Sequence, residues 1–84
     1  MIRKKQKKPR YKDMDPAAKK FLTNYGKRIR QKRKKCKKTI TQMAAAINSD
    51  ISRLSRIENG KINLTINDIY LLDKQMDECL QKNI

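Results

Sequence analysis

Histidine is absent from the chain, and cysteine, glycine and proline occur only twice each. A zinc site needs four nitrogen or sulfur ligands, so two cysteines without histidine exclude one. Without histidine or a glycine-rich loop, and with acids scattered along the chain, no constellation for catalysis is present. We therefore predict that the chain is not an enzyme and that it uses no metal, cofactor or small-molecule substrate.

Long apolar runs are missing as well. The chain has no stretch of 18 apolar residues to span a membrane, and its first segment, MIRKKQKKPRYK, lacks the apolar core of a signal peptide. Cys36 and Cys79 are expected to be free thiols that pack as small apolar side chains on helices. Two free thiols suit a reducing compartment, so we expect a cytoplasmic protein, associated with the nucleoid in a bacterium.

Positive charge is abundant and unevenly spread. The chain has 23 Lys and Arg residues against 8 Asp and Glu, a net charge of +15. Residues 1–38 hold 18 of these bases and two of the acids. A block this basic repels itself unless a polyanion neutralises it, so the expected partner is nucleic acid rather than an anionic membrane surface.

The spacing of apolar residues predicts an all-α protein with four to five short helices. Residues 1–14 have almost nothing to bury and are expected to form a disordered basic arm. The folded domain is therefore placed at residues 15–84. Its last segment, DECLQKNI, fits either a final turn of the fourth helix or a short fifth helix.

The first helix is predicted to begin at Asp15 and Pro16, a good N-cap followed by a residue favoured at the first helical position. Arg33 comes four residues after Ile29 and therefore falls on the inner, apolar face. An arginine there is costly unless a carboxylate meets it. The other inner positions of this helix are Leu22, Tyr25 and Cys36.

Two capping boxes, Thr39 to Gln42 and Thr65 to Asp68, predict the starts of the second and fourth helices. Asp50 is expected to cap a short third helix that ends at Asn59-Gly60. Asn48 can adopt the left-handed conformation that ends the second helix. The predicted inner positions are Met43, Ala44, Ile47, Leu54, Ile57, Ile66, Ile69, Leu72 and Met76.

Two short helices joined by about three residues, in MAAAINSDISRLSRI, have the spacing of a helix-turn-helix. From about Tyr25 to Met76, some 60% of the chain, the sequence resembles the lambda-repressor-like, Cro/Xre-type helix-turn-helix DNA-binding domain. GKRIRQKR is similar to the first helix of that family, MAAAIN to its LAxxLG and LTINDIYLLDKQM to its fourth helix. RIENGK is the most specific stretch.

The resemblance implies a compact bundle with a central helix-turn-helix and double-stranded DNA as its partner. Family members usually bind as dimers, so a homodimer is expected, with Tyr70 and Leu80 as candidate contacts. In this family an arginine of the first helix pairs with the glutamate that closes the third, here Arg33 and Glu58. A guanidinium can bind a carboxylate through two hydrogen bonds. In the alternative interpretation, Glu58 is a solvated helix end near Arg56.

A recognition helix lies in the major groove with its N-terminal residues against the base edges. Arg56 could donate two hydrogen bonds to a guanine, whereas Ile51 could only pack on a thymine methyl group. Arg53 could read a base or hold a phosphate. The predicted base-reading residues are Ile51, Ser52, Arg53 and Arg56.

Phosphate contacts are expected where helices begin, because the free N–H groups there favour anions. The sequence departs from the family at Ile40, where a glutamine often binds phosphate, and at Lys38, which replaces a usual leucine and offers a cation. The lysines of the arm and first helix should add affinity without sequence choice. The predicted phosphate-binding residues are Lys38, Thr39, Thr41, Gln42, Asn59, Lys61, Asn63 and Thr65.

These features predict a sequence-specific DNA-binding transcriptional regulator that reads the major groove with residues 51–58. Two alternatives stay open. One is a protein-binding adaptor on the same fold, such as an antitoxin or a transcriptional coactivator. The other is a general basic binder of RNA or nucleoid DNA.

Overall fold

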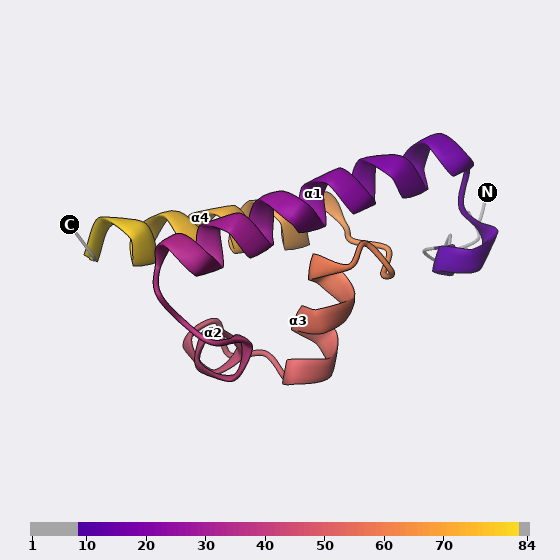
Figure 1. Ribbon diagram of the computed structural model, residues 1–84. Coiled ribbons are helices and arrows are strands. Elements are labelled where there is room, and N and C mark those ends of the chain that lie inside the picture. The colour runs from indigo at the N-terminus through magenta and orange to yellow at the C-terminus, as the bar shows by residue number, and fades with distance from the viewer. Residues whose placement is uncertain (1–8, 83–84) are drawn as a thin grey trace, which may run out of the picture.

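The computed structural model describes residues 9–82 and contains helices but no strand over that range (Figure 1). The all-α class is therefore confirmed. The last helix is continuous to Lys82, so the segment from residue 77 to residue 82 extends the fourth helix instead of forming a fifth. The elements are the 3-10 helix η1 (Tyr11–Asp13) and the α-helices α1 (Pro16–Lys35), α2 (Ile40–Ala46), α3 (Ile51–Glu58) and α4 (Ile66–Lys82).

The helices begin at the predicted capping residues. Thr39 Oγ1 accepts a hydrogen bond from the Gln42 backbone N–H at 3.1 Å, and Gln42 Oε1 accepts one from the Thr39 N–H at 2.9 Å. Such caps satisfy N–H groups that a helix start leaves without an intrahelical acceptor. The other caps are Asp15 on α1, Asp50 on α3, and the reciprocal pair Thr65 and Asp68 on α4.

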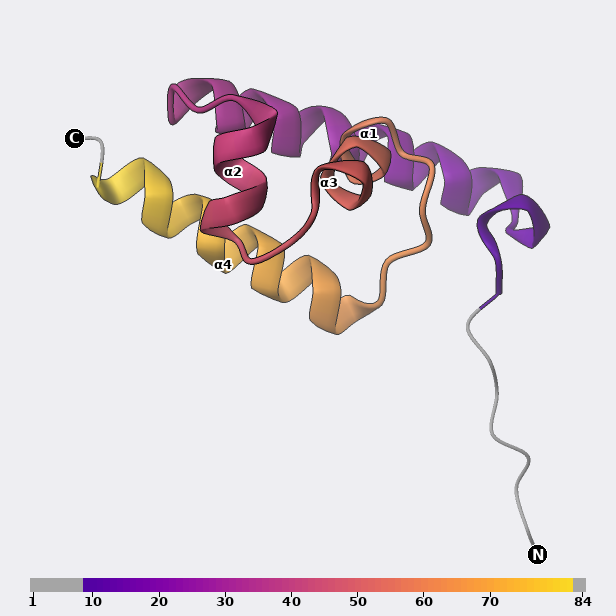
Figure 2. The same cartoon turned by 90° about the horizontal axis from the view of Figure 1, so that it is seen from below.

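Two long helices form the frame of the molecule. α1 and α4 lie side by side, and α2 and α3 pack on one side of this pair (Figures 1 and 2). The C-terminal end of α3 rests against α1, while its N-terminal end projects away from both long helices (Figure 1). Asn48 has φ +55°, left-handed as predicted, where the chain reverses between α2 and α3. The buried core consists of Leu22, Tyr25, Ile29, Cys36, Met43, Ala44, Ile47, Leu54, Ile57, Leu64, Leu72 and Met76.

One predicted inner position is wrong. Ile66 is 87% exposed, although Leu64 before it is buried and Ile69 after it packs against the core. The covered stripe of this helix begins at Ile69 and continues through Leu72 and Met76. Cys36, by contrast, is buried as the predicted continuation of the α1 inner face.

Residues 9–14, which belong to the predicted arm, contact the folded domain. Tyr11 and Met14 pack against the core from η1, and Asn63 Nδ2 donates a hydrogen bond to the Pro9 carbonyl at 2.9 Å. The side chains of Tyr11 and Met14 supply apolar surface to bury, although the basic residues around them make the segment as a whole polar. Residues 1–8 of the predicted arm lie outside the described residues.

Both glycines lie where α1 meets the end of α3. A Cβ atom on Gly26 would overlap the Ile57 carbonyl oxygen and lie 2.6 Å from the Glu58 carbonyl oxygen. A Cβ atom on Gly60, which has φ +66°, would meet the backbone of Thr23. Glycine alone permits these backbones to approach so closely, so the two residues fix the C-terminal end of α3 on α1.

A polar cluster joins α1 to α4. The Tyr25 hydroxyl lies 3.1 Å from Asp73 Oδ1 and 3.3 Å from the Ile69 carbonyl oxygen, and Lys32 Nζ lies 3.1 Å from Asp77 Oδ1. Burial, and then the negative charge of Asp73, raises the pKa of the Tyr25 phenol. The phenol therefore stays protonated and acts as a donor to α4.

The two cysteines are expected to differ in reactivity. Cys36 is 3% exposed, whereas Cys79 is partly exposed. Burial, followed by contact with the Cys79 thiol, raises the pKa of Cys36 to about 11. Because the thiolate is the reactive form, a maleimide at about pH 8 should label Cys79 at least about tenfold faster than Cys36. Mass spectrometry of peptides from a labelling time course measures the ratio. Equal rates in urea are the control, and equal rates in the native protein would contradict the expectation.

Candidate nucleic-acid interface

α3 presents one buried face and one exposed face. Leu54 and Ile57 are 0% and 1% exposed and pack into the core. On the other side of the helix, Ser52 and Arg56 are exposed and, being four residues apart, are neighbours. Ile51, in the first turn, is 47% exposed. We call Ile51, Ser52 and Arg56 the outer face of α3.

Arg33 and Glu58 form a bidentate ion pair at the junction of α1 and α3. Arg33 Nε donates to Glu58 Oε2 at 2.7 Å, and Nη2 donates to Oε1 at 3.1 Å. A third donor, Nη1, lies 3.0 Å from the Lys38 carbonyl oxygen. The hydrogen bond to Glu58 raises the pKa of the Arg33 guanidinium, which stays charged.

Burial distinguishes this pair from a surface ion pair. The Glu58 side chain is 4% exposed and that of Arg33 is 12% exposed. The alternative interpretation of Glu58 as a solvated helix end therefore does not hold. The hydrogen bonds that Arg33 donates to both carboxylate oxygens replace the hydrogen bonds to water that Glu58 loses on burial. The pair links the last residue of α3 to α1 and, through Lys38, to the loop before α2.

A hollow of about 350 Å³ lies beside this ion pair. Arg30, at its edge, is 56% exposed, and its Nε lies 3.9 Å from Glu58 Oε1. The hollow brings two predicted phosphate-binding residues, Thr39 and Asn59, next to that arginine. Ile40, at the position where the family often has glutamine, forms part of the same wall.

Arg53 is arranged differently from the other predicted base-reading residues. Its Nη2 lies 3.6 Å from Asp68 Oδ1 at the start of α4, and its side chain is 34% exposed. The guanidinium is therefore directed toward α4, whereas Ile51, Ser52 and Arg56 face outward.

The predicted phosphate-binding residues of the second helix lie on the α1–α2 loop and the first turn of α2. Thr39 and Gln42 use their oxygens in the capping box, which leaves the threonine O–H and the glutamine NH₂ as donors. Thr41 is exposed and Lys38 is partly exposed. These side chains can therefore offer both neutral donors and a cation to an anion.

Three predicted residues of the α3–α4 loop make contacts within the protein. Asn59 Nδ2 donates to the Ser55 carbonyl at 2.8 Å and so closes α3, while Asn63 holds the Pro9 carbonyl. Thr65 lies in the capping box with Asp68, whose negative charge disfavours a phosphate there. Lys61, the fourth predicted residue of this loop, is exposed and brings a positive charge.

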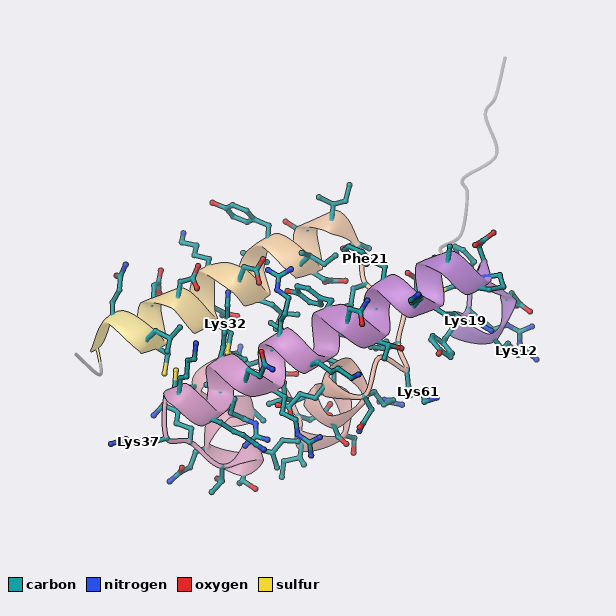
Figure 3. The ribbon with its side chains drawn as sticks, turned by 45° about the horizontal axis from the view of Figure 1, so that its top comes forward. Lys12, Lys19, Phe21, Lys32, Lys37 and Lys61 are labelled. Atoms are coloured by element: carbon teal, nitrogen blue, oxygen red, sulfur yellow. The ribbon has the colours of Figure 1, made fainter. Side chains whose placement is uncertain are left out.

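Acidic side chains of α4 lie close to a lysine of α1. The acids of α4 include Asp73 and Asp77, which lie 3.7 Å and 3.1 Å from Lys32 Nζ. Figure 3 shows Lys32 directed between α1 and α4 and Lys37 directed outward at the end of α1. The basic cluster of the α1–α2 junction consists of Lys34, Lys35, Lys37 and Lys38.

The roles of four residues were missed by sequence reasoning. Gly26 follows Leu22 by four positions, so the helical spacing already predicts that it lies on the inner face of α1. Tyr11 and Met14 are two apolar residues within a basic segment, and the sequence alone shows this contrast. Nothing in the local sequence indicates that Arg30 approaches Glu58, because this contact depends on how α3 crosses α1.

A family model described as helix-turn-helix matches residues 29–78, which is more than half of the chain and includes the outer face of α3. Comparison with curated proteins and comparison with solved structures gave no match. Across residues 9–82, no group of three or more His, Cys, Asp or Glu side chains could hold a metal ion. No helix in this range has the length and apolar character needed to cross a membrane.

Proposed function

Because the chain belongs to the Cro/C1-type helix-turn-helix family of DNA-binding domains, we propose that it is a sequence-specific regulator of transcription that reads duplex DNA with α3. The observation that carries this proposal is the outer face of α3. Its side chains are exposed on a helix whose opposite face is buried and whose last residue is held by Arg33. A rigid helix with one open face can enter a major groove.

The outer face of α3 offers a short set of reading groups. Arg56 can donate two hydrogen bonds to the O6 and N7 atoms of a guanine, which gives about 1–3 kcal/mol of discrimination against other bases. Ile51 can pack on a thymine methyl group, and Ser52 can donate to or accept from either kind of base pair. Arg53 is better placed for a phosphate or a structural role, since it is directed toward Asp68.

Phosphate contacts are proposed on both sides of the outer face of α3. Thr39, Thr41, Gln42 and Lys38 would hold one backbone from the start of α2. Lys61 would hold the backbone near the α3–α4 loop through its positive charge. Asn59 and Asn63 are held by contacts within the protein, and Thr65 lies beside Asp68, so these three are not proposed as phosphate ligands. The basic cluster of the α1–α2 junction adds positive charge next to the first group, which supports tight but salt-dependent binding.

The regulator is proposed to bind as a homodimer on two half-sites about one helical turn of DNA apart. Tyr70 is 62% exposed on α4 and is the candidate contact between subunits. Leu80 is partly buried against the protein's own core and contributes less surface.

Arg56→Ala is expected to remove sequence preference. Selection from a randomised duplex library at about 150 mM salt should enrich a defined half-site with the wild-type protein. The variant should bind that site about 10–100-fold more weakly and lose preference at one base position, since one bidentate contact is lost. Arg28→Ala is the matched control, because it removes the same charge from an exposed arginine beside Tyr25 on α1.

Other results would favour the alternatives. Equal enrichment of all sequences would indicate a general nucleic-acid binder in which the basic residues dominate. If the protein did not bind duplex DNA and retained one stoichiometric protein partner, an adaptor on the same fold would be favoured. Equal losses from Arg56→Ala and Arg28→Ala would show that Arg56 acts only through its charge.

A further inference from the structure

The two cysteines come from distant parts of the chain and meet beside the core. Cys36 directly follows the last residue of α1, and Cys79 lies in the last turn of α4. Cys36 is buried, and Cys79 packs against the same core cluster. Both cysteines are reduced, and their thiols are in hydrogen-bonding contact with each other. The proposed function uses neither thiol.

The register of α1 against α4 accounts for this meeting. The two helices lie side by side and run in the same direction (Figures 1 and 2). Lys32 Nζ of α1 lies 3.1 Å from Asp77 Oδ1 of α4. Cys36 follows Lys32 by four residues, about one helical turn, and Cys79 follows Asp77 by two. The contact between the thiols therefore continues the series of contacts that joins α1 to α4.

Solvent reaches this pair of thiols from the Cys79 side. Cys79 is partly exposed and lines an open hollow of about 270 Å³ together with Lys38 and Met43. Cys36 is only 3% exposed. An oxidant in solution therefore meets the Cys79 thiol first, and the Cys36 thiol lies behind it, within reach of the oxidised sulfur.

We propose that Cys36 and Cys79 form a redox pair that hydrogen peroxide converts to an intramolecular disulfide. The Cys79 sulfur attacks one peroxide oxygen, the O–O bond breaks, and the released hydroxide takes up the thiol proton as water. The Cys36 sulfur then attacks the sulfur of the Cys79 sulfenic acid, the S–O bond breaks, and a second water leaves with the Cys36 proton. One peroxide is thus reduced to two waters while two thiols become one disulfide.

The contact between the thiols makes the second step possible. Because burial raises the pKa of Cys36 to about 11, its thiol is largely protonated near neutral pH and reacts slowly with molecules in solution. Attack on Cys79 is intramolecular, however, and a reacting group held next to its target gains a high effective concentration. Cys36 is therefore a poor target for a reagent in solution and a suitable partner for Cys79.

The disulfide closes a long loop of the chain. Residues 36–79 contain all of α2 and α3 and most of α4. A disulfide across a long loop stabilises a protein mainly by restricting the unfolded chain. Oxidation should therefore raise the Tm by about 10 °C or more. The pair acts as an oxidation-sensitive lock on the folded helix-turn-helix, and this inference does not depend on DNA binding.

Mass spectrometry of the full-length protein after treatment with hydrogen peroxide tests the proposal. The protein should lose the mass of two hydrogen atoms and yield a crosslinked peptide that contains Cys36 and Cys79, and dithiothreitol should reverse both changes. The crosslink should form at least about tenfold faster in the native protein than in urea, because the fold holds the thiols together. Circular dichroism of the oxidised protein, with a dithiothreitol-treated sample as control, measures the rise in Tm.

Two variants check the role of each cysteine. In Cys36→Ala, the Cys79 sulfenic acid should accumulate and be trapped by dimedone, whereas the wild type should give little adduct. In Cys79→Ser, peroxide should leave the Tm unchanged. If Cys36→Ala does not fold, the oxidised and reduced wild-type proteins still provide the comparison. A disulfide mainly between molecules, equal crosslinking rates in the native protein and in urea, or a crosslink without a rise in Tm would overturn the proposal.

Discussion

Arg33→Met is expected to destabilise the domain by about 3–5 kcal/mol. The substitution leaves the Glu58 carboxylate, 4% exposed, without the guanidinium that binds both of its oxygens. A chain of this size is typically stable by only about 0.05–0.15 kcal/mol per residue. For 84 residues this is about 4–13 kcal/mol in total, so the loss removes a large share of the stability of the domain.

Urea denaturation followed by circular dichroism measures this loss. Arg30→Met is the matched control, because Arg30 lies 3.9 Å from the same carboxylate but is 56% exposed, so its removal should cost less than about 1 kcal/mol. Arg33→Met combined with Glu58→Leu should recover much of the loss, because no uncompensated buried charge remains. Equal effects of Arg33→Met and Arg30→Met would show that the pair behaves as an ordinary surface contact.

Gly26→Ala is expected to have the second-largest effect, a loss of about 3 kcal/mol or more. Alanine favours a helix over glycine by about 1 kcal/mol, which acts in the opposite direction. The new Cβ atom, however, would overlap the Ile57 carbonyl oxygen and lie 2.6 Å from that of Glu58. These atoms belong to backbone that cannot rotate away, so α3 must move off α1, and the steric term exceeds the gain in helix propensity.

Two measurements check this expectation. Asn24→Ala, at an exposed position of the same helix, reports the change in helix propensity alone and should be neutral or slightly stabilising. Gly26→Ala should lower the urea midpoint and weaken DNA binding together, since both depend on the seating of α3. A variant with wild-type stability would show that α1 and α3 can separate there without loss.

Features that depend only on residues close together in the sequence could be predicted. Thr39 and Gln42 form their capping box from neighbouring residues, so the sequence contains everything that the contact requires. The meeting of Arg33 with Glu58 was predictable for another reason. An arginine on the inner face of a helix is costly unless a carboxylate meets it, and the resemblance to the helix-turn-helix family identified Glu58 as that carboxylate.

The remaining features depend on how separate elements meet. Ile66 has the spacing of an inner residue but is exposed, because the way α4 sits on the other helices decides which of its residues are covered. Arg53 turns toward Asp68 because α4 begins beside α3, and residues 9–11 contact the α3–α4 loop through Asn63 and Lys61. No window of a few residues contains that information.

The close seating of α3 on α1 has a geometric consequence for recognition. α3 is eight residues long, so its first residue lies about 10 Å from the end that touches Gly26. A tilt of only about 5° at that pivot displaces Ile51 by about 1 Å over this length. A displacement of that size lengthens a hydrogen bond beyond its useful range. Substitutions at either glycine can therefore misalign the distant tip of α3 and, under the proposed function, change which DNA sequences it binds.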